Sequence, residues 1–168
     1  MRPSKQEYFV NIVKAVAERA TCDRGKSGAI IVKDDQIIST GYVGSAAGDD
    51  HCDDVGHKFE HRIKGGYSTT EKDGVISIAL DDISTHCVRT IHAEQNAICQ
   101  AAKHGHSINR ATIYCTMVPC RICAMMIINS GIIKVVALKE YQTSKQTKDL
   151  FKKCGVKLTI LDSTYNEY

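Results

Sequence analysis

Two short motifs that must meet in space constrain this chain more than any other feature. The first is His92-Ala93-Glu94, and the second, 25 residues after Glu94, is Pro119-Cys120-Arg121-Ile122-Cys123. One imidazole and two thiolates supply three ligands of a tetrahedral zinc ion and leave the fourth position open for water, as catalytic zinc sites do. We therefore expect His92, Cys120 and Cys123 to bind a catalytic zinc ion, with Glu94 beside it as the proton carrier.

Other interpretations of these motifs explain fewer of their residues. A closed structural zinc site needs a fourth protein ligand nearby, and the motif offers Glu94 instead. A redox-active dithiol would need neither His92 nor Glu94. For Glu94 alone, the alternative is a carboxylate that stabilises the first turn of a helix.

Composition and charge exclude several classes of protein. The 168 residues suit one domain, residues 1–168, with a hydrophobic core, since 43% of them are hydrophobic and 24% are charged. The net charge is only +3 without a Lys/Arg block, so nothing indicates a nucleic-acid partner. No apolar run is long enough for a membrane-spanning helix. Residues 1–7 are polar and contain no signal-peptide core, which predicts a cytoplasmic protein.

The chain has eight cysteines. Without a signal peptide, metal ligation and buried thiols explain them better than disulfides do. Three of them, Cys99, Cys115 and Cys154, lie in apolar or helical contexts and are expected in the core.

Apolar periodicity and turn residues predict alternating helices and strands. A first helix is capped by Ser4 and Glu7 and has apolar positions as far as Ala20. Further helices are expected at 93–103, 120–129 and 144–153, and strands at 28–33, 36–41, 111–116, 132–138 and 156–161. This order predicts an α/β fold with a central mixed sheet of about five strands and helices on both faces.

Residues 42–86 interrupt this pattern. They contain four of the seven histidines, and nine acidic against four basic residues. We expect an irregular insert, with a short hairpin around 75–80, and an irregular segment of this length is usually functional.

The expected helices place the two motifs together. His92 and Glu94 lie at the start of one helix, and Cys120 and Cys123 at the start of the next. Cys120 and Cys123 are three residues apart, so that their sulfurs face the same way. Helix N-termini also favour thiolates.

With these motifs, the chain resembles the cytidine deaminase superfamily, and within it the deoxycytidylate (dCMP) deaminases. The resemblance covers about residues 5–161 and includes Thr21-Cys22-Asp23-Arg24, Gly28-Ala29-Ile30-Ile31-Val32, Ser39-Thr40-Gly41-Tyr42 and 89–98. It implies a three-layer α/β/α fold and zinc-dependent hydrolysis of dCMP to dUMP, the precursor for thymidylate synthesis. It also implies a homo-oligomer, a hexamer in the bacterial and phage types, and dCTP and dTTP as effectors.

The resemblance also implies substrate contacts, and one of them departs from the family pattern. Such enzymes read G-Y-N-G where this chain reads Gly41-Tyr42-Val43-Gly44, and Val43 cannot make the side-chain hydrogen bond of Asn to the sugar. Ser45 is a candidate to replace it. Ala93 and Tyr141 are the other expected contacts, although Tyr141 could equally be a core residue.

A second metal centre is expected from the remaining Cys and His residues. Cys22, Cys52, His57 and Cys87 would form a closed, structural zinc site if the insert returns to the first helix. Some bacterial and phage dCMP deaminases carry a second zinc in this region. His86 or His51 could replace one ligand, and the four residues could also be unrelated.

Three alternative functions stay open from the sequence. Val43 keeps a deaminase of dCTP or of a modified cytosine nucleotide in view. A tRNA adenosine deaminase conflicts with the acidic insert and the weak net charge, and an inactive nucleotide-binding subunit conflicts with the intact zinc motif.

Overall fold

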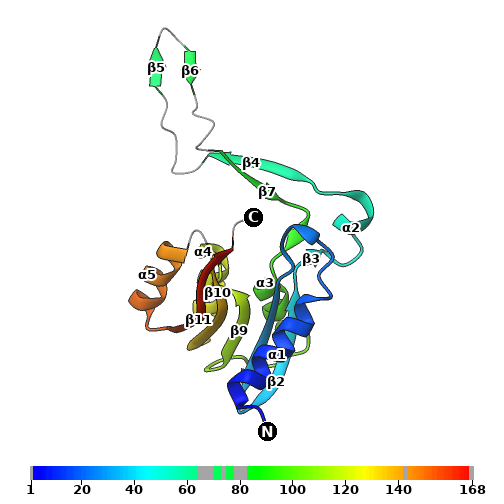
Figure 1. Ribbon diagram of the computed structural model, residues 1–168, viewed down its shortest axis with the longest axis vertical. Coiled ribbons are helices and arrows are strands. Elements are labelled where there is room, and N and C mark those ends of the chain that lie inside the picture. Colours follow the sequence, from blue (N-terminus) through cyan, green and yellow to red (C-terminus); the bar gives the residue numbers. More distant parts are fainter. Residues whose placement is uncertain (1, 64–69, 73–74, 78–82, 142–143, 167–168) are drawn as a thin grey trace.

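The computed structural model describes residues 2–63, 70–72, 75–77, 83–141 and 144–166 (Figure 1). The helices are α1 (Lys5–Ala17), the 3-10 helix η1 (Asp23–Gly25), α2 (Cys52–Val55), α3 (Ala93–Lys103), α4 (Arg121–Asn129) and α5 (Ser144–Cys154). The long strands are β1 (Gly28–Lys33), β2 (Gln36–Tyr42), β9 (Thr112–Met117), β10 (Lys134–Tyr141) and β11 (Lys157–Asn166). Within the described part of the chain, no helix has the length and apolar character that crossing a bilayer requires.

The five long strands form one mixed sheet in the order β11-β10-β9-β1-β2. β1 is antiparallel to β2 and β9, whereas β10 runs parallel to both β9 and β11. Asp34 and Asp35, which join β1 to β2, both have positive φ, as a tight two-residue hairpin turn requires. The predicted five-stranded mixed sheet is confirmed.

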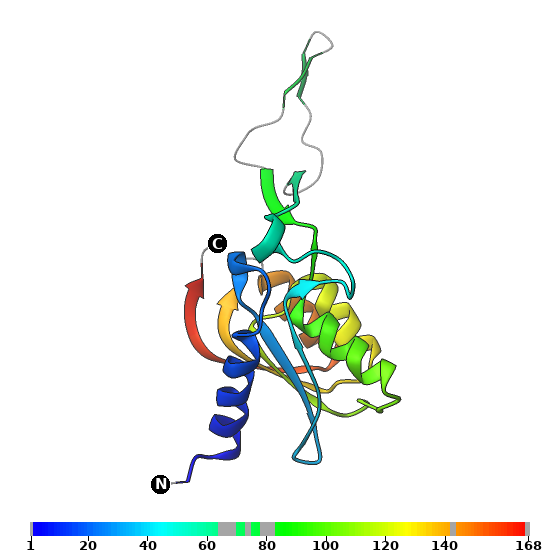
Figure 2. The same ribbon diagram turned by 90° about the vertical axis from the view of Figure 1, so that its right-hand side faces the viewer.

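Helices cover both faces of this sheet (Figure 2). On one face, α1 packs Phe9 and Val13 against Ile30 and Val136. On the other face, Ala29 and Ile31 of β1 lie in a core with α3, α4 and α5. Successive residues of a strand point to opposite faces, so β1 contributes to both cores. The chain therefore has the expected three-layer α/β/α architecture.

Several predicted boundaries shift. α1 ends at Ala17 rather than near Ala20, because the Thr21 N–H donates to the carbonyl oxygen of Val43 instead of continuing the helix. β11 runs to Asn166, since its pairing with β10 continues to Tyr141. Of the three cysteines expected in the core, Cys115 is buried, but Cys99 and Cys154 are exposed because they lie on the solvent faces of α3 and α5.

The prediction of an irregular segment at 42–86 is wrong for most of its described residues. β3 (Gly44–Ser45) pairs with β8 (Thr90–Ile91), and β4 (Phe59–Ile63) pairs with β7 (Ile83–Cys87). The β4–β7 ribbon extends away from the central sheet (Figure 1), and Phe59 in it is 49% exposed. The sequences of the two strands, Phe-Glu-His-Arg-Ile and Ile-Ser-Thr-His-Cys, have apolar residues only at their ends, so neither shows the pattern that predicts a strand.

A short hairpin does occur close to its expected position. β5 (Thr70–Lys72) pairs with β6 (Val75–Ser77), so the second strand begins at the expected Val75, while residues 78–80 lie outside the described residues.

Candidate functional site

Helix α3 is held against β2, and this fixes the first motif. Gly41 lies so close to α3 that a Cβ atom there would be 2.3 Å from the carbonyl oxygen of Ala93. The Asn96 side chain donates to the Tyr42 carbonyl at 2.8 Å, and the Ser39 hydroxyl donates to the Ala97 carbonyl at 2.9 Å. The start of α3, which follows His92 and carries Glu94, is therefore anchored directly to the sheet.

The second motif is fixed by the loop between β9 and α4. The Thr147 hydroxyl of α5 donates to the Pro119 carbonyl at 2.9 Å, and the Val118 N–H donates to the Lys139 carbonyl at 3.0 Å. Cys120 is the N-cap residue of α4, and Cys123 is buried one turn later. The two sulfurs therefore lie at the start of α4, as expected.

The two motifs meet around one point. Cys120 Sγ lies 3.5 Å from His92 Nδ1 and 3.5 Å from Cys123 Sγ, and Cys123 Sγ lies 3.4 Å from His92 Nδ1. With metal bonds of about 2.3 Å to sulfur and about 2.0 Å to nitrogen, tetrahedral zinc ligands lie roughly 3.5–3.8 Å apart. The three atoms fit a zinc ion, and a fourth protein ligand is not part of this group within the described residues.

Glu94, two residues after His92, is buried and interacts with His92 and Cys123. Burial raises the pKa of its carboxyl group above 4.5, while the charge of His92 acts in the opposite direction. A raised pKa makes the carboxylate a stronger base, and a carboxyl group that both takes up and releases protons can serve as a general acid and base.

The two thiols of the group are hydrogen-bonded to each other, with their sulfurs 3.5 Å apart. The hydrogen bond between Cys120 and Cys123 lowers the pKa of Cys120 to about 4, although burial opposes this shift. The same hydrogen bond raises the pKa of Cys123, and burial adds to the effect. One thiolate is therefore favoured at neutral pH, and thiolates are the form of cysteine that binds metals.

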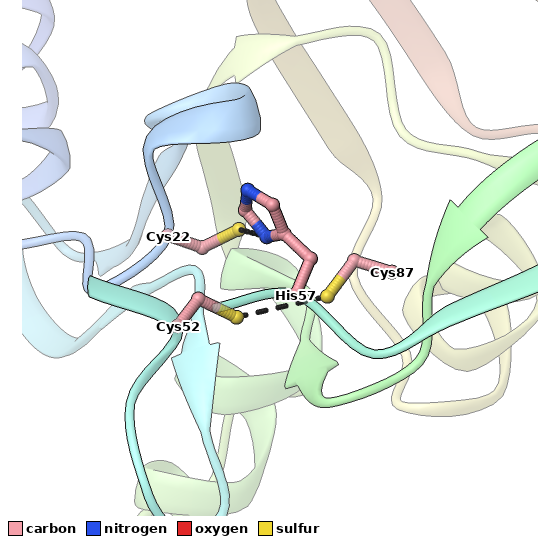
Figure 3. Close-up of side chains that lie close together, drawn as sticks. All are labelled: Cys22, Cys52, His57 and Cys87. Atoms are coloured by element: carbon pink, nitrogen blue, oxygen red, sulfur yellow. Dashed lines mark hydrogen bonds between the residues drawn. The ribbon is translucent and has the colours of Figure 1, made fainter. Parts of the chain in front are cut away.

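A second group of four side chains converges where the insert meets the end of α1. The ligand atoms of Cys22, Cys52, His57 and Cys87 all lie within 4.8 Å of one another. Cys22 Sγ is 3.7 Å from His57 Nδ1, and Cys52 Sγ is 3.6 Å from Cys87 Sγ. Figure 3 shows the three sulfurs and the imidazole directed toward a common point. These distances also fit a tetrahedral zinc ion.

The second group comes from three segments of the chain. Cys22 precedes η1, Cys52 begins α2, His57 follows α2, and Cys87 ends β7. The structure thus brings together the four predicted residues. His51 is the exposed N-cap residue of α2 and does not belong to the group, and the side chain of His86 lies outside the described residues.

Cys87 has the most acidic thiol of the second group. Burial acts to raise its pKa, but hydrogen bonds from the backbone of Arg89 and Lys58 lower it to about 7. By contrast, burial raises the pKa of Cys52 to about 12. Backbone N–H groups directed at a sulfur are a common means of stabilising a metal-binding thiolate.

The two groups are joined by a short segment of chain. Only Val88–Ile91 separates Cys87 from His92, and its strand β8 pairs with β3 through Ser45↔Thr90 and Gly44↔Ile91.

Three of the four predicted substrate contacts lie in or next to the paired strands β3 and β8. Val43, between β2 and β3, is buried and donates its N–H to the Ser27 carbonyl at 2.9 Å. The Ser45 hydroxyl is buried and has no hydrogen-bond partner among the described residues. Ala93 is buried as the first residue of α3, whereas the side chain of Tyr141 lies outside the described residues.

Sequence analysis did not identify two polar residues at these groups. Asp23 pairs with His57, its Oδ1 lying 3.1 Å from Nε2, and Asn96 ties α3 to β2. Two signals were available: both residues lie in stretches that carry the family resemblance, and Asp23 directly follows a predicted ligand, Cys22.

Comparison with known proteins gives a consistent family. The model of the cytidine and deoxycytidylate deaminase zinc-binding region matches residues 3–139. The deoxycytidylate deaminase of Enterobacteria phage T2 is 35% identical over 171 residues, which covers 92% of this chain and 90% of that protein. ComE operon protein 2 of Bacillus subtilis (strain 168) is 38% identical over 155 residues, covering 92% of this chain and 70% of that protein.

A solved structure shares the fold. The dCMP deaminase of cyanophage S-TIM5, in complex with dCMP and dUMP, superimposes with a TM-score of 0.66 at 26% identity. The match covers 95% of this chain and 98% of that chain.

Proposed function

Because the chain belongs to the cytidine and deoxycytidylate deaminase family, we propose that it hydrolyses dCMP to dUMP and ammonia at the group formed by His92, Cys120 and Cys123. The observation that carries the proposal is the convergence of these three ligand atoms, 3.4–3.5 Å apart, beside the buried carboxyl of Glu94. The dUMP formed would supply thymidylate synthesis.

The roles of the residues follow from their chemistry. His92 Nδ1 and the sulfurs of Cys120 and Cys123 would hold zinc. When bound, zinc supplies a water whose pKa falls to about 7, so that a nucleophile is available at neutral pH. His92 is exposed in this group, so that substrate and water can approach it from solvent.

Glu94 would move the protons of the reaction. Hydrolysis replaces the amino group at C4 of cytosine with the oxygen of water, and dCMP plus water gives dUMP plus ammonia. Glu94 takes a proton from the attacking water and donates it to N3 of the ring. It then takes the second proton from the hydroxyl group now on C4 and delivers it to the departing amine, which leaves as ammonia. Its raised pKa suits this alternation between the acid and the carboxylate.

Substrate recognition would involve the residues around β3. The free hydroxyl of Ser45 can hydrogen-bond to the sugar or its phosphate, since it has no other partner in the described structure. Val43 offers only apolar contact, and Ala93 offers no side-chain hydrogen bond. The apolar Val43 favours a second candidate, deamination of dCTP or of a modified cytosine nucleotide.

A substrate series tests the proposal. The purified protein should deaminate dCMP with a higher kcat/KM than deoxycytidine, CMP or dCTP. A preference for dCTP or for a 5-substituted nucleotide would favour the second candidate. Absence of activity on every cytosine nucleotide, in protein that contains zinc, would contradict both.

We also propose that Cys22, Cys52, His57 and Cys87 bind a second zinc ion with a structural role. Four protein ligands close the coordination of zinc, as in structural sites. The insert buries little apolar surface where it is described, and a metal would order it in place of a hydrophobic core.

The oligomer and its regulation are inferred from the family resemblance. We propose a hexamer that responds to dCTP and dTTP. Light scattering of the purified protein with and without each nucleotide measures the mass. The dependence of rate on dCMP concentration, with and without dCTP or dTTP, measures the regulation.

A further inference from the structure

His57 is the one residue of the second group with two ring nitrogens, and each of them has a partner. Nδ1 lies 3.7 Å from Cys22 Sγ, on the side of the ring that faces the group (Figure 3). Nε2, on the opposite side of the ring, lies 3.1 Å from Oδ1 of Asp23. Since Asp23 directly follows Cys22, one turn of the chain contacts both ends of the same imidazole.

These two contacts define which nitrogen carries the proton. An ionised carboxylate can only accept hydrogen bonds, so Nε2 of neutral His57 donates its N–H to Asp23. The lone pair is then on Nδ1, the nitrogen that faces the sulfurs. Histidines that bind metals usually donate their other N–H in this way, which fixes the ring and makes it a better ligand.

Two further side chains support the ring. Phe59 packs against His57 with 5.3 Å between the ring centroids. The guanidinium carbon of Arg24 lies 5.1 Å from the centre of the Phe59 ring. Asp23 and Arg24, neighbours in η1, thus both contact the segment that carries His57, which restricts how the imidazole can rotate.

We propose that Asp23 is a positioning residue of the second centre, which accepts the Nε2–H of His57 and holds Nδ1 toward the three sulfurs. The inference rests on the proposed zinc ion at that centre. The competing interpretation is an ordinary surface ion pair, because the Asp23 side chain is 75% exposed. Such a pair would contribute little to stability and would not affect metal binding.

Zinc release to a chromogenic chelator distinguishes the two interpretations. Asp23→Ala should release the second zinc about tenfold faster than wild type, at the lower end of the 10–100-fold effects of such outer residues. Asp23→Asn, which retains an acceptor oxygen, should fall between the two. Asp53→Ala is the matched control, because exposed Asp53 directly follows another cysteine of the group, Cys52, and it should release zinc as wild type does.

The tautomer of His57 gives an independent readout. Long-range proton–nitrogen NMR spectra should show Nε2 protonated in the wild type and a mixture of tautomers in zinc-depleted Asp23→Ala. Wild-type release rates in Asp23→Ala, or equal acceleration in Asp53→Ala, would overturn the proposal. A single zinc ion per wild-type chain would also overturn it, whereas dCMP deamination by the same samples reports separately on the proposed function.

Discussion

The two Cys/His groups use the same ligand types but differ in what surrounds them. The group of His92, Cys120 and Cys123 has three ligands and a buried carboxyl, Glu94, beside them. The second group has four candidate ligands, enough to complete the tetrahedral coordination of a zinc ion. An open position allows zinc to act on water, whereas a closed one allows it only to join segments of chain.

The secondary structure that carries the two groups differs as well. The first stands on α3 and α4, which pack into the main hydrophobic core. The second joins η1, α2 and the ends of short strands, where Val55 and Phe59 are about half exposed. We infer that the core positions the first group before metal binds, while metal binding itself assembles the second.

Removing one cysteine from each group should separate the two roles most clearly. Cys120→Ala should lose the catalytic zinc and all measurable deamination, while the fold persists. Cys52→Ala should lose the other zinc and loosen the insert, because structural zinc contributes about 10–16 kcal/mol to the folding of small zinc-dependent units. Zinc content and hydrogen exchange of residues 44–60 measure these outcomes. Loss of both zinc ions from Cys52→Ala would show that the centres are not independent.

Glu94→Gln should remove proton transfer and leave both metals in place. The amide cannot carry protons, so kcat for dCMP should fall by about 10²- to 10⁴-fold. Zinc content and the free energy of unfolding serve as controls. Turnover close to that of wild type would show that Glu94 is not the proton carrier.

Val43→Asn tests how the proposed active site at His92, Cys120 and Cys123 binds the sugar of its substrate. If dCMP is the substrate, the new amide should add one hydrogen bond to the sugar and lower KM for dCMP about 2- to 10-fold. Steady-state kinetics with dCMP and dCTP check this result. An unchanged or higher KM for dCMP would indicate a different substrate, or that Ser45 already makes this contact.

The smallest effect is expected at Glu140 of β10, which contacts Ser144 and Lys148 of α5. Helix α5 in turn supports the loop before Cys120 through Thr147. Hydrogen bonds from Lys148 and Ser144 lower the pKa of Glu140 below its usual 4.5. A lowered pKa in the folded state means that this stabilisation is present above the unfolded-state pKa and is lost as the pH falls through the folded-state pKa. Glu140→Gln should therefore lower Tm by about 1–3 °C at pH 7, and the difference should shrink below pH 4.5. A difference that grows at acid pH would contradict the assignment.

The sequence predicted the convergence of His92, Cys120 and Cys123 and the central sheet because both depend on short-range patterns. His92 with Glu94, and Cys120 with Cys123, each lie within one turn of chain, and the apolar strands and helices that carry them follow simple periodicities. The second group was predicted by elimination among the remaining cysteines and histidines, with the family resemblance as a guide.

The parts that the sequence did not predict depend on contacts between distant segments. β4 and β7 pair with each other across 20 residues of chain or more, and their polar sequences give no hydrophobic pattern that would predict the pairing. Asp23 pairs with His57 only because the insert returns to η1, and no local pattern encodes that return.

Counting the zinc ions of the purified wild-type protein tests the central claim most directly. Native mass spectrometry, or elemental analysis against protein concentration, should give about two zinc ions per chain in active protein prepared without chelators. One zinc ion per chain in well-folded, fully active protein would contradict the account, because the second group would then be held together without a metal.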